Sequence, residues 1–377
     1  MSPAPGGRPK PPFRADHVGS LLRPKALLDA RAKRDLGEIS ADQLRAVEDA
    51  AIREAVKLQE DLGFRGITDG EFRRRQWHTD FLKGFANVAT VPPSLKVKFH
   101  TEQGDVEMAP PGLRVAGMLG RPRPIFVEAF KFLKGATKAT PKVTIPSPST
   151  MHFRGGRGAV DTAAYPDMAA FYADLGRVYA EEIADLGRNG LTYLQIDEVN
   201  LAYLCDPALR EQVRGIGEDP ATLPRTYAQL INAAVATKPA EMTVCMHLCR
   251  GNFQSAWVAE GGYDPVAEIL FNEINVDGYF LEYDTPRAGG FAPLRFVPKG
   301  KTVVLGLVTT KSGTLETADA IKRRIDEAAK YLPLDQLCLS PQCGFSSTVE
   351  GNLLGFENQK AKLSLVAQVA RDVWGGI

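Results

Sequence analysis

The sequence predicts one α/β domain folded as a (β/α)8 TIM barrel, with an insertion between its second and third strands. Short runs of β-branched and aromatic residues alternate with segments of helical periodicity, which is the pattern of a parallel sheet with helical crossovers. Eight such units fit within 377 residues, a length that one α/β barrel with insertions reaches. Polar residues follow several predicted strands, at the end where such barrels place their active sites.

The elements follow one another in a regular order. The predicted strands span residues 13–18, 64–68, 142–145, 191–196, 242–247, 279–282, 302–307 and 336–339. A capping box, Ser40-Ala-Asp-Gln43, begins a helix that ends near Gly63. The other predicted helices span 125–133, 165–186, 221–238, 264–272, 315–331 and 355–373. The motif Asp-Leu-Gly recurs at 61–63 and 185–187, each time just before a predicted strand, which fixes the boundary between helix and strand.

Two segments fall outside this alternation. Residues 85–140 contain a predicted hairpin around 95–108 and a stretch rich in proline and glycine, and we expect them to form the insertion over the barrel mouth. Residues 1–12 are rich in proline and glycine and are expected to form a flexible tail. The barrel domain then comprises residues 13–377.

Composition narrows the class of partner. The 46 basic residues nearly balance the 45 acidic ones, and no segment concentrates positive charge as a nucleic-acid groove would. No apolar run reaches the 18 residues of a membrane span, and the first residues lack the apolar core of a signal peptide. Five cysteines, an odd number, fit a reducing compartment better than a disulfide framework. We therefore expect a cytoplasmic protein with small-molecule partners, which binds neither nucleic acid nor membrane.

One histidine, two cysteines and a glutamate suggest a metal site. His247 and Cys249 follow the fifth predicted strand, Glu282 ends the sixth and Cys343 follows the eighth. A single His-x-Cys pair is weak evidence, because buried cysteine often acts as a small apolar residue. The case for a metal site becomes stronger because all four residues are expected at the same end of the barrel. This soft ligand set suits zinc. The remaining cysteines are expected to be structural: Cys205, Cys245 and Cys338.

The ligand types indicate the chemistry. Two thiolates and a carboxylate leave a zinc site negatively charged, which favours activation of a substrate thiol over polarisation of a carbonyl. Alkyl transfer to sulfur is therefore expected. A sensor or storage protein that keeps the metal cage without catalysis is a further possibility, as in closed structural zinc sites.

Five motifs in chain order carry a family resemblance: Arg14-Ala-Asp-His-Val-Gly-Ser-Leu-Leu-Arg-Pro24, Thr68-Asp-Gly-Glu-Phe72, Leu194-Gln-Ile-Asp-Glu198, His247-Leu-Cys249 with Glu282, and Ser340-Pro-Gln-Cys343-Gly. The chain resembles the catalytic half of cobalamin-independent methionine synthase, and in length it resembles the short, single-barrel members. The resemblance implies a 5-methyltetrahydropteroyltriglutamate–homocysteine methyltransferase-like enzyme of methionine biosynthesis. It also implies that zinc is held by the four metal-site residues just described.

The same resemblance implies a pocket for homocysteine. Glu71 and Asp197 would bind the amino group, and the backbone near Gly19 and Ser20 would bind the carboxylate. This agrees with the chemistry of an amino-acid substrate, which needs buried acids for its ammonium. Either acid alone is equally typical of a helix N-terminus.

Two histidines join Asp197 as candidate catalytic residues. His17, at the end of the first predicted strand, is expected to orient a substrate group or line the metal pocket, although a buried core histidine fits that position equally well. His78, beside Trp77, is a candidate proton donor to a leaving group.

The methyl donor is less well defined. Residues 143–151 contain no tryptophan, whereas full-length synthases carry one after the third strand that stacks on the folate ring. We therefore expect a donor other than the usual polyglutamyl methyltetrahydrofolate: a methylcorrinoid protein, an S-methyl compound or another small molecule.

A different thiol acceptor would require different charged residues around the substrate. A protein resembling the epoxyalkane:coenzyme M transferases would bind a sulfonate, so Arg23 or the run Arg73 to Arg75 would have to face the site. Glu71 and Asp197 favour an ammonium instead.

Overall fold

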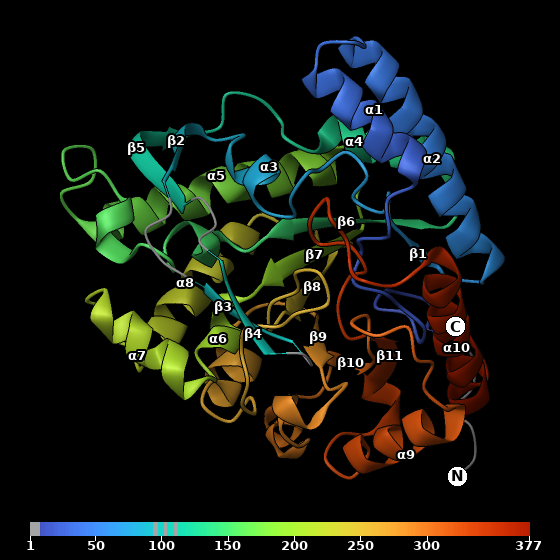
Figure 1. The fold of residues 1–377 in the computed structure, drawn as a ribbon. Coiled ribbons are helices and arrows are strands. Elements are labelled where there is room, and N and C mark those ends of the chain that lie inside the picture. The colour runs from blue at the N-terminus through green and yellow to red at the C-terminus, as the bar shows by residue number, and fades with distance from the viewer. Residues whose placement is uncertain (1–7, 93–96, 102–103, 109–111) are drawn as a thin grey trace.

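A curled parallel sheet surrounded by helices forms the body of the protein (Figure 1). The computed structural model describes residues 8–92, 97–101, 104–108 and 112–377. Seven parallel strands lie in the order β1 (Gly66–Ile67), β6 (Thr140–Pro146), β7 (Tyr193–Glu198), β8 (Thr243–Leu248), β9 (Gly278–Glu282), β10 (Thr302–Val308) and β11 (Leu337–Pro341). Because consecutive strands are neighbours and parallel, their carboxyl ends meet at one edge.

The first predicted strand, residues 13–18, is not a ladder strand in the described chain. Ala15 forms one isolated parallel bridge with Leu339 of β11, where Asp16 N donates to Leu339 O at 3.0 Å. Side-chain contacts hold the segment in place instead. Asp16 accepts a hydrogen bond from Tyr193 Oη at 2.7 Å and forms an ion pair with Lys142 at 3.1 Å. The α/β class and the curled parallel sheet are confirmed, and the closed eight-stranded barrel remains a prediction.

The other seven predicted strands are present, each within two residues of its expected bounds. The shortest is β1, which is only Gly66–Ile67 although residues 64–68 were expected. Its two residues pair with Thr140 and Pro141 at the start of β6, and the chain then leaves the sheet toward Glu71.

Helices surround the sheet (Figure 1). The α-helices among the described residues are α1 (Lys25–Asp35), α2 (Ala41–Asp61), α3 (Thr79–Leu82), α4 (Val127–Ala136), α5 (Met168–Arg188), α6 (Asn200–Tyr203), α7 (Pro207–Gly215), α8 (Leu223–Val235), α9 (Ala318–Ala328) and α10 (Phe356–Trp374). The capping box of α2 is confirmed by reciprocal bonds between Ser40 and Gln43. The helix expected at 264–272 is instead the short π-helix Ile269–Glu273, and α1, α3, α6 and α7 were not expected.

The expected insertion contains two small antiparallel sheets outside the main one. β2 (Ala86–Val91) pairs with β5 (Gly112–Gly120), and β3 (Val97–Thr101) pairs with β4 (Gly104–Met108) as the predicted hairpin. The helix α4 comes after these sheets in the chain and directly before β6, so it occupies the position of a regular crossover helix. His100 of β3 exchanges backbone hydrogen bonds of 2.7 and 3.0 Å with Trp257, which fastens the hairpin to the loop after β8.

A small cluster of buried residues fills the inside of the curled sheet. It consists of Phe13, Val18, Tyr193, Cys245, Phe280, Val304 and Cys338, all buried. Cys245 and Cys338 therefore pack in the interior as expected, and Cys205 is also buried.

Part of the expected N-terminal tail is held by the domain. Residues 1–7 lie outside the described residues, but Arg8 donates to Asp335 O at 3.2 Å and its carbonyl accepts from Arg65 at 2.7 Å. Among the helices in the described ranges, none is long and apolar enough to cross a membrane.

Candidate functional site

Four potential metal ligands converge at the carboxyl edge of the sheet. His247 lies in β8, Cys249 directly follows that strand, Glu282 ends β9 and Cys343 follows β11. One ligand atom from each lies within 4.8 Å of the others, and all four side chains are buried. The structure thus brings together all four residues expected to form the metal site.

Strand geometry explains the convergence. His247 and Cys249 are two residues apart, so their side chains lie on the same side of an extended chain. Glu282 lies opposite Gly306 in the parallel register of β9 and β10. A Cβ atom at Gly306 would lie 2.7 Å from Gln342 Cα and 2.8 Å from Leu281 O, so only glycine lets the segment carrying Cys343 approach β9.

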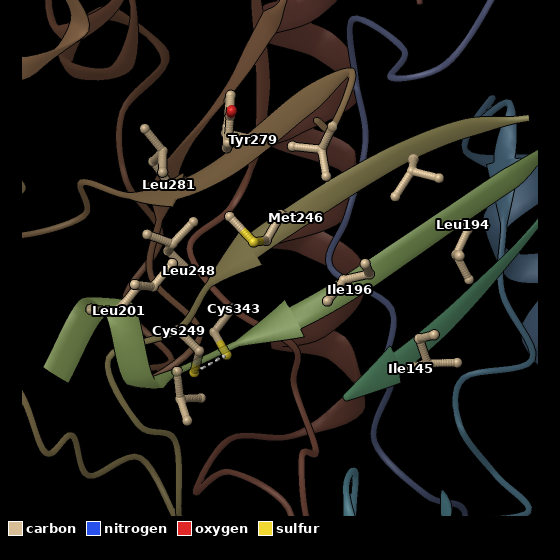
Figure 2. Packing of buried hydrophobic residues seen from close by; sticks show 14 of the residues in the cluster. Ile145, Leu194, Ile196, Leu201, Met246, Leu248, Cys249, Tyr279, Leu281 and Cys343 are labelled. Carbon is tan, nitrogen blue, oxygen red and sulfur yellow. Dashed lines mark hydrogen bonds between the residues drawn. The ribbon is translucent and has the colours of Figure 1, made fainter. Parts of the chain in front are cut away.

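The polar atoms of this cluster fit a cation. Neither ring nitrogen of His247 has a hydrogen-bond partner although the side chain is buried, which is unusual unless a lone pair binds something else. Cys249 Sγ and Cys343 Sγ lie 3.5 Å apart and point toward each other (Figure 2). That separation is too long for a disulfide and close to the roughly 3.8 Å between two sulfurs on a tetrahedral zinc ion.

Protonation within the cluster favours one thiolate. The hydrogen bond from the Cys249 thiol, together with the nearby imidazole of His247, holds the pKa of Cys343 well below its usual range. The same bond and burial raise the pKa of Cys249 well above its usual range. Burial and the charge of Cys343 also raise the pKa of Glu282. The cluster therefore concentrates negative charge that a divalent cation would neutralise.

A cavity of about 280 Å³ opens beside the cluster. It is lined by Val18, Ser20, Glu71, Gln76, Trp77, His78, Phe99, Arg154, Asp197, Val199, Tyr203, His247, Cys249, Gly251, Asn252, Phe253, Cys343, Ser347, Thr348 and Glu350. This metal-site cavity contains both acids expected to bind an amino group.

The two acids influence one another. Glu71 Oε1 accepts a hydrogen bond from Thr144 Oγ1 at 2.8 Å and lies 3.7 Å from Arg74 Nη1, with which it forms an ion pair, while Glu71 Oε2 has no partner. Asp197 accepts from Gln195 Nε2 at 2.6 Å. Burial and then the charge of Glu71 raise the pKa of Asp197 to about 7. Two buried acids with spare oxygen lone pairs form a site that a cationic group would stabilise.

Comparison with known proteins gives the family. Residues 13–371 match the family model described as the cobalamin-independent synthase, catalytic domain. The chain belongs to this family. Its members are methyltransferases, so the enzyme class expected from the sequence is confirmed.

Individual relatives support the same placement. The chain is 46% identical over 367 residues to the Bacillus subtilis (strain 168) protein YxjH, described as uncharacterized, covering 97% of this chain and 96% of YxjH. It is 26% identical to a methionine synthase of Pyrococcus abyssi, covering 87% of this chain and 84% of that protein. A Listeria monocytogenes crystal structure, described as a candidate vitamin-B12-independent methionine synthase, is 38% identical, with a TM-score of 0.77 over 98% of this chain and 100% of that one.

In this cobalamin-independent synthase-family chain, the adjacent acids Asp197 and Glu198 have separate surroundings. Glu198 accepts from the backbone N–H groups of Asn200 and Leu201 at 2.6 and 3.0 Å and so caps α6, whereas Asp197 lines the metal-site cavity. The helix-terminus position, which the sequence also allowed for Asp197, is therefore occupied by its neighbour Glu198.

Two glycines determine the shape of the wall of the metal-site cavity around Ser20. Gly19 has φ +143°, and a Cβ there would lie 2.8 Å from Thr144 Cγ2 and 3.3 Å from Glu71 Oε1. A Cβ at Gly344 would collide with the Ser20 hydroxyl. Close approach of the two loops thus places Ser20 in the lining of the cavity.

The two candidate histidines lie in different places. His78 lines the metal-site cavity and packs against Trp77 at 4.6 Å, and burial followed by the charge of Arg154 lowers its pKa to about 3. It is therefore neutral at pH 7, which suits a hydrogen-bonding contact better than donation from an imidazolium. His17 packs edge-on against Phe64 at 5.3 Å and is not among the residues lining the metal-site cavity.

The arginines weighed for sulfonate binding have other partners. Arg23 donates to the carbonyls of Ser346 and Thr348 at 2.9 Å, and Arg73 pairs with Glu48 and Asp49. Neither they nor Arg74 and Arg75 line the metal-site cavity.

Sequence reasoning missed Arg154 and the aromatic wall. Arg154 lines the metal-site cavity but belongs to no motif, so only its position after the third predicted strand could have indicated it. The cavity also contains Trp77, Phe99, Tyr203 and Phe253, which come from four different segments. The absence of tryptophan from residues 143–151 therefore does not leave the site without an aromatic surface, and the identity of the donor stays a prediction.

Proposed function

We propose that the protein is a zinc-dependent methyltransferase that moves a methyl group to the thiol of homocysteine and so forms methionine. The observation that carries the proposal is the buried cluster of His247, Cys249, Glu282 and Cys343 beside two buried acids in one cavity. A structural zinc site needs no such cavity, whereas an enzyme needs room for a substrate at the metal.

The donor set supports zinc. One nitrogen, two sulfurs and one carboxylate match its preferred ligands, and the unpartnered imidazole of His247 supplies a free lone pair. When bound, zinc would coordinate the substrate thiol and lower its pKa, so that a nucleophilic thiolate is present at neutral pH.

The protein's own groups would orient homocysteine. Glu71 and Asp197 would bind its ammonium, and the chain near Gly19 and Ser20 would bind its carboxylate. Asp197 lies directly opposite His247 in the register of β7 and β8, so an ammonium at Asp197 keeps the short side chain of homocysteine near the cluster.

In the transfer step one bond forms and one bond breaks. A lone pair of the substrate sulfur forms the new S–C bond, the bond between the methyl carbon and the donor breaks, and its electron pair leaves with the donor. The proton released when the thiol ionises passes to solvent. Orientation of the two reactants is the main contribution expected of the protein. A methylcorrinoid protein and a small-molecule donor both remain compatible.

Calorimetric titration of the zinc-loaded protein in buffers of different ionisation enthalpy tests the acceptor. We expect homocysteine to bind with release of about one proton per site, as thiolate formation requires. Binding of homocysteine without proton release would contradict thiolate formation, and no binding at all would contradict the choice of acceptor.

One observation favours a second acceptor class. Arg154 lines the metal-site cavity and could pair with the sulfonate of a thiol such as coenzyme M, as in the epoxyalkane:coenzyme M transferases. The same titration with coenzyme M separates the candidates, because two acids near the tail would repel a sulfonate and attract an ammonium.

A further inference from the structure

A second cavity is lined by residues of α2, α4, β6 and the segments around α3. Its volume is about 560 Å³, within the usual range for small-molecule sites. It shares no lining residue with the metal-site cavity. We call it the basic cavity, because three acidic residues of its lining face six basic ones: Arg45, Arg73, Arg74, Lys83, Arg123 and Lys142.

The three acidic residues of the basic cavity have partners of their own. Asp69 accepts from the backbone N–H of Glu71 at 2.8 Å, and Asp80 accepts from two backbone N–H groups at the same distance. Glu128 forms an ion pair with Lys131 at 2.9 Å. These contacts leave the basic residues of the lining without acidic partners inside the cavity.

Three of the basic side chains are unpaired. Arg45 lies in α2, Lys83 directly follows α3 and Arg123 precedes α4, and all three are exposed. Within the described chain, none of these three side chains forms a hydrogen bond or an ion pair. Arg73 and Lys142 pair with acids outside the lining. The cavity therefore carries an excess of positive charge that a bound anion would neutralise.

Arg74 connects the basic cavity to the pocket of Glu71 and Asp197, which we call the amino-acid pocket. The Arg74 side chain is buried, and its Nη2 donates to Thr144 O at 2.7 Å. Its Nη1 makes no hydrogen bond but lies 3.7 Å from Glu71 Oε1. Burial and the charge of Glu71 raise the pKa of Asp197 to about 7, whereas the charge of Arg74 acts in the opposite direction. The guanidinium thus acts electrostatically on both acids.

The unpaired bases indicate the class of ligand. Guanidinium and ammonium groups bind the oxygens of phosphate, sulfonate and carboxylate groups. Because the three unpaired side chains come from three segments around one cavity, the matching ligand carries more than one negative group.

We propose that the basic cavity binds a small molecule with two or more negatively charged groups, and that this polyanion acts as an effector of the amino-acid pocket through Arg74. Binding of the polyanion is independent of the proposed function, whereas the effector role rests on it. An anion beside Arg74 would offset the positive charge that Glu71 and Asp197 experience, so these acids would attract an ammonium more strongly. The coupling is reciprocal, because homocysteine must then tighten binding of the polyanion by the same factor.

Titration with two matched sulfonates tests the binding. 1,3-Propanedisulfonate carries two anionic groups, and 1-propanesulfonate carries one on the same carbon chain. At constant ionic strength, calorimetry with the wild-type protein should show the disulfonate binding about tenfold more tightly, as one additional charge-assisted contact provides. Equal affinities, or no binding of the disulfonate at millimolar concentration, would overturn the proposal.

Variants of the exposed bases locate the contact. The double substitution Lys83→Gln with Arg123→Gln should weaken disulfonate binding about tenfold and leave the Tm unchanged, because neither side chain has a partner to lose. The control Arg323→Gln removes an exposed arginine of α9 outside the lining and should keep the wild-type affinity. Unchanged affinity in the double variant, or an equal loss in the control, would contradict the assignment.

Homocysteine titrations test the effector role. With the zinc-loaded wild-type protein, saturating disulfonate should lower the Kd of homocysteine about fivefold at constant ionic strength. The double variant should bind homocysteine as the wild type does without disulfonate, and the same disulfonate concentration should then change the Kd by less than about twofold. A Kd that disulfonate leaves unchanged in the wild type, or lowers equally in the double variant, would overturn the effector role.

The two proposals can fail separately. The sulfonate titrations need neither zinc nor homocysteine, so their failure would leave the zinc-thiolate proposal standing. If homocysteine did not bind at all, the proposed function and the effector role would be wrong, whereas the sulfonate titrations would still decide whether the basic cavity binds a polyanion.

Discussion

Cys249 and Cys343 have opposite pKa shifts although their sulfurs lie only 3.5 Å apart. The pair retains one proton while it is free of metal, and a bound cation would displace it. Both sulfurs are buried, so water cannot replace either as a ligand without rearrangement. Each thiol should therefore be necessary for metal binding.

Replacing Cys343 with serine should remove zinc, because a hydroxyl is a poor ligand for this ion. We expect the purified Cys343→Ser protein to contain less than about a tenth of the wild-type zinc by elemental analysis. Cys205→Ser is the matched control: Cys205 is buried and donates to Leu201 O, a bond that serine can make, so zinc should be retained. Full zinc content in Cys343→Ser would show that Cys343 is not a ligand.

Asp197→Asn tests the amino-group site separately from the metal. The amide keeps the shape of the side chain but loses its charge, so zinc content should stay unchanged while the apparent Kd for homocysteine rises about tenfold. Glu198→Gln should instead lower the Tm, because Glu198 caps α6. Loss of zinc in Asp197→Asn would contradict the assignment of the pocket.

Some residues of the site could be predicted from the sequence and others could not. The four metal-site residues belong to motifs whose position after strands predicted their convergence. The separate roles of Asp197 and Glu198 could not be predicted, because alternation along β7 decides which one faces the cavity. Arg154 and Phe99 come from segments without a motif and reach the metal-site cavity only through the tertiary fold.

At the scale of elements, the parallel strands were predictable because most of them are short, largely buried runs rich in apolar residues. Residues 13–18 have the composition of a strand, yet the ion pair between Asp16 and Lys142 and the hydroxyl of Tyr193 fix them without a ladder. These contacts join residues more than a hundred positions apart, so no local pattern indicates them. The π-helix at Ile269–Glu273 likewise departs from the expected period.

One prediction concerns the place where β9, β10 and the segment after β11 pack together. Gly306→Ala places a methyl group 2.7 Å from Gln342 Cα, so the backbone must shift and move Cys343 away from Glu282. We expect a loss of about 1–3 kcal/mol in the free energy of unfolding and weaker zinc binding. Denaturant unfolding and zinc titration would measure both.

Gly290→Ala is the control for that substitution. No atom lies within 4 Å of a Cβ at this exposed position, so stability should stay within about 0.5 kcal/mol of the wild type. If Gly306→Ala behaved like the control, tight packing at this junction would not determine the position of Cys343.

Across the whole molecule, the four candidate ligands come from three separate stretches of chain, near residues 247–249, 282 and 343. A bound ion would connect β8, β9 and the segment after β11 at their carboxyl ends. Any ligand that binds only the folded state stabilises it in proportion to the logarithm of its concentration over its Kd.

Removal of metal should therefore lower thermal stability. We expect a chelator to reduce the Tm of the wild-type protein by at least about 5 °C, and added zinc to restore it. The Cys343→Ser variant, which lacks the site, should show no such difference. An equal chelator effect in both proteins would mean that the stabilising ion lies elsewhere.

Cobalt(II) substitution tests the central claim, that the acceptor thiol binds a metal held by His247, Cys249, Glu282 and Cys343. Cobalt takes the place of zinc in such sites, and each thiolate bound to it absorbs light by charge transfer from sulfur. Adding homocysteine to the cobalt-loaded protein should increase this absorption in a saturable way, while homoserine should not. A spectrum unchanged by homocysteine at saturation would contradict the account.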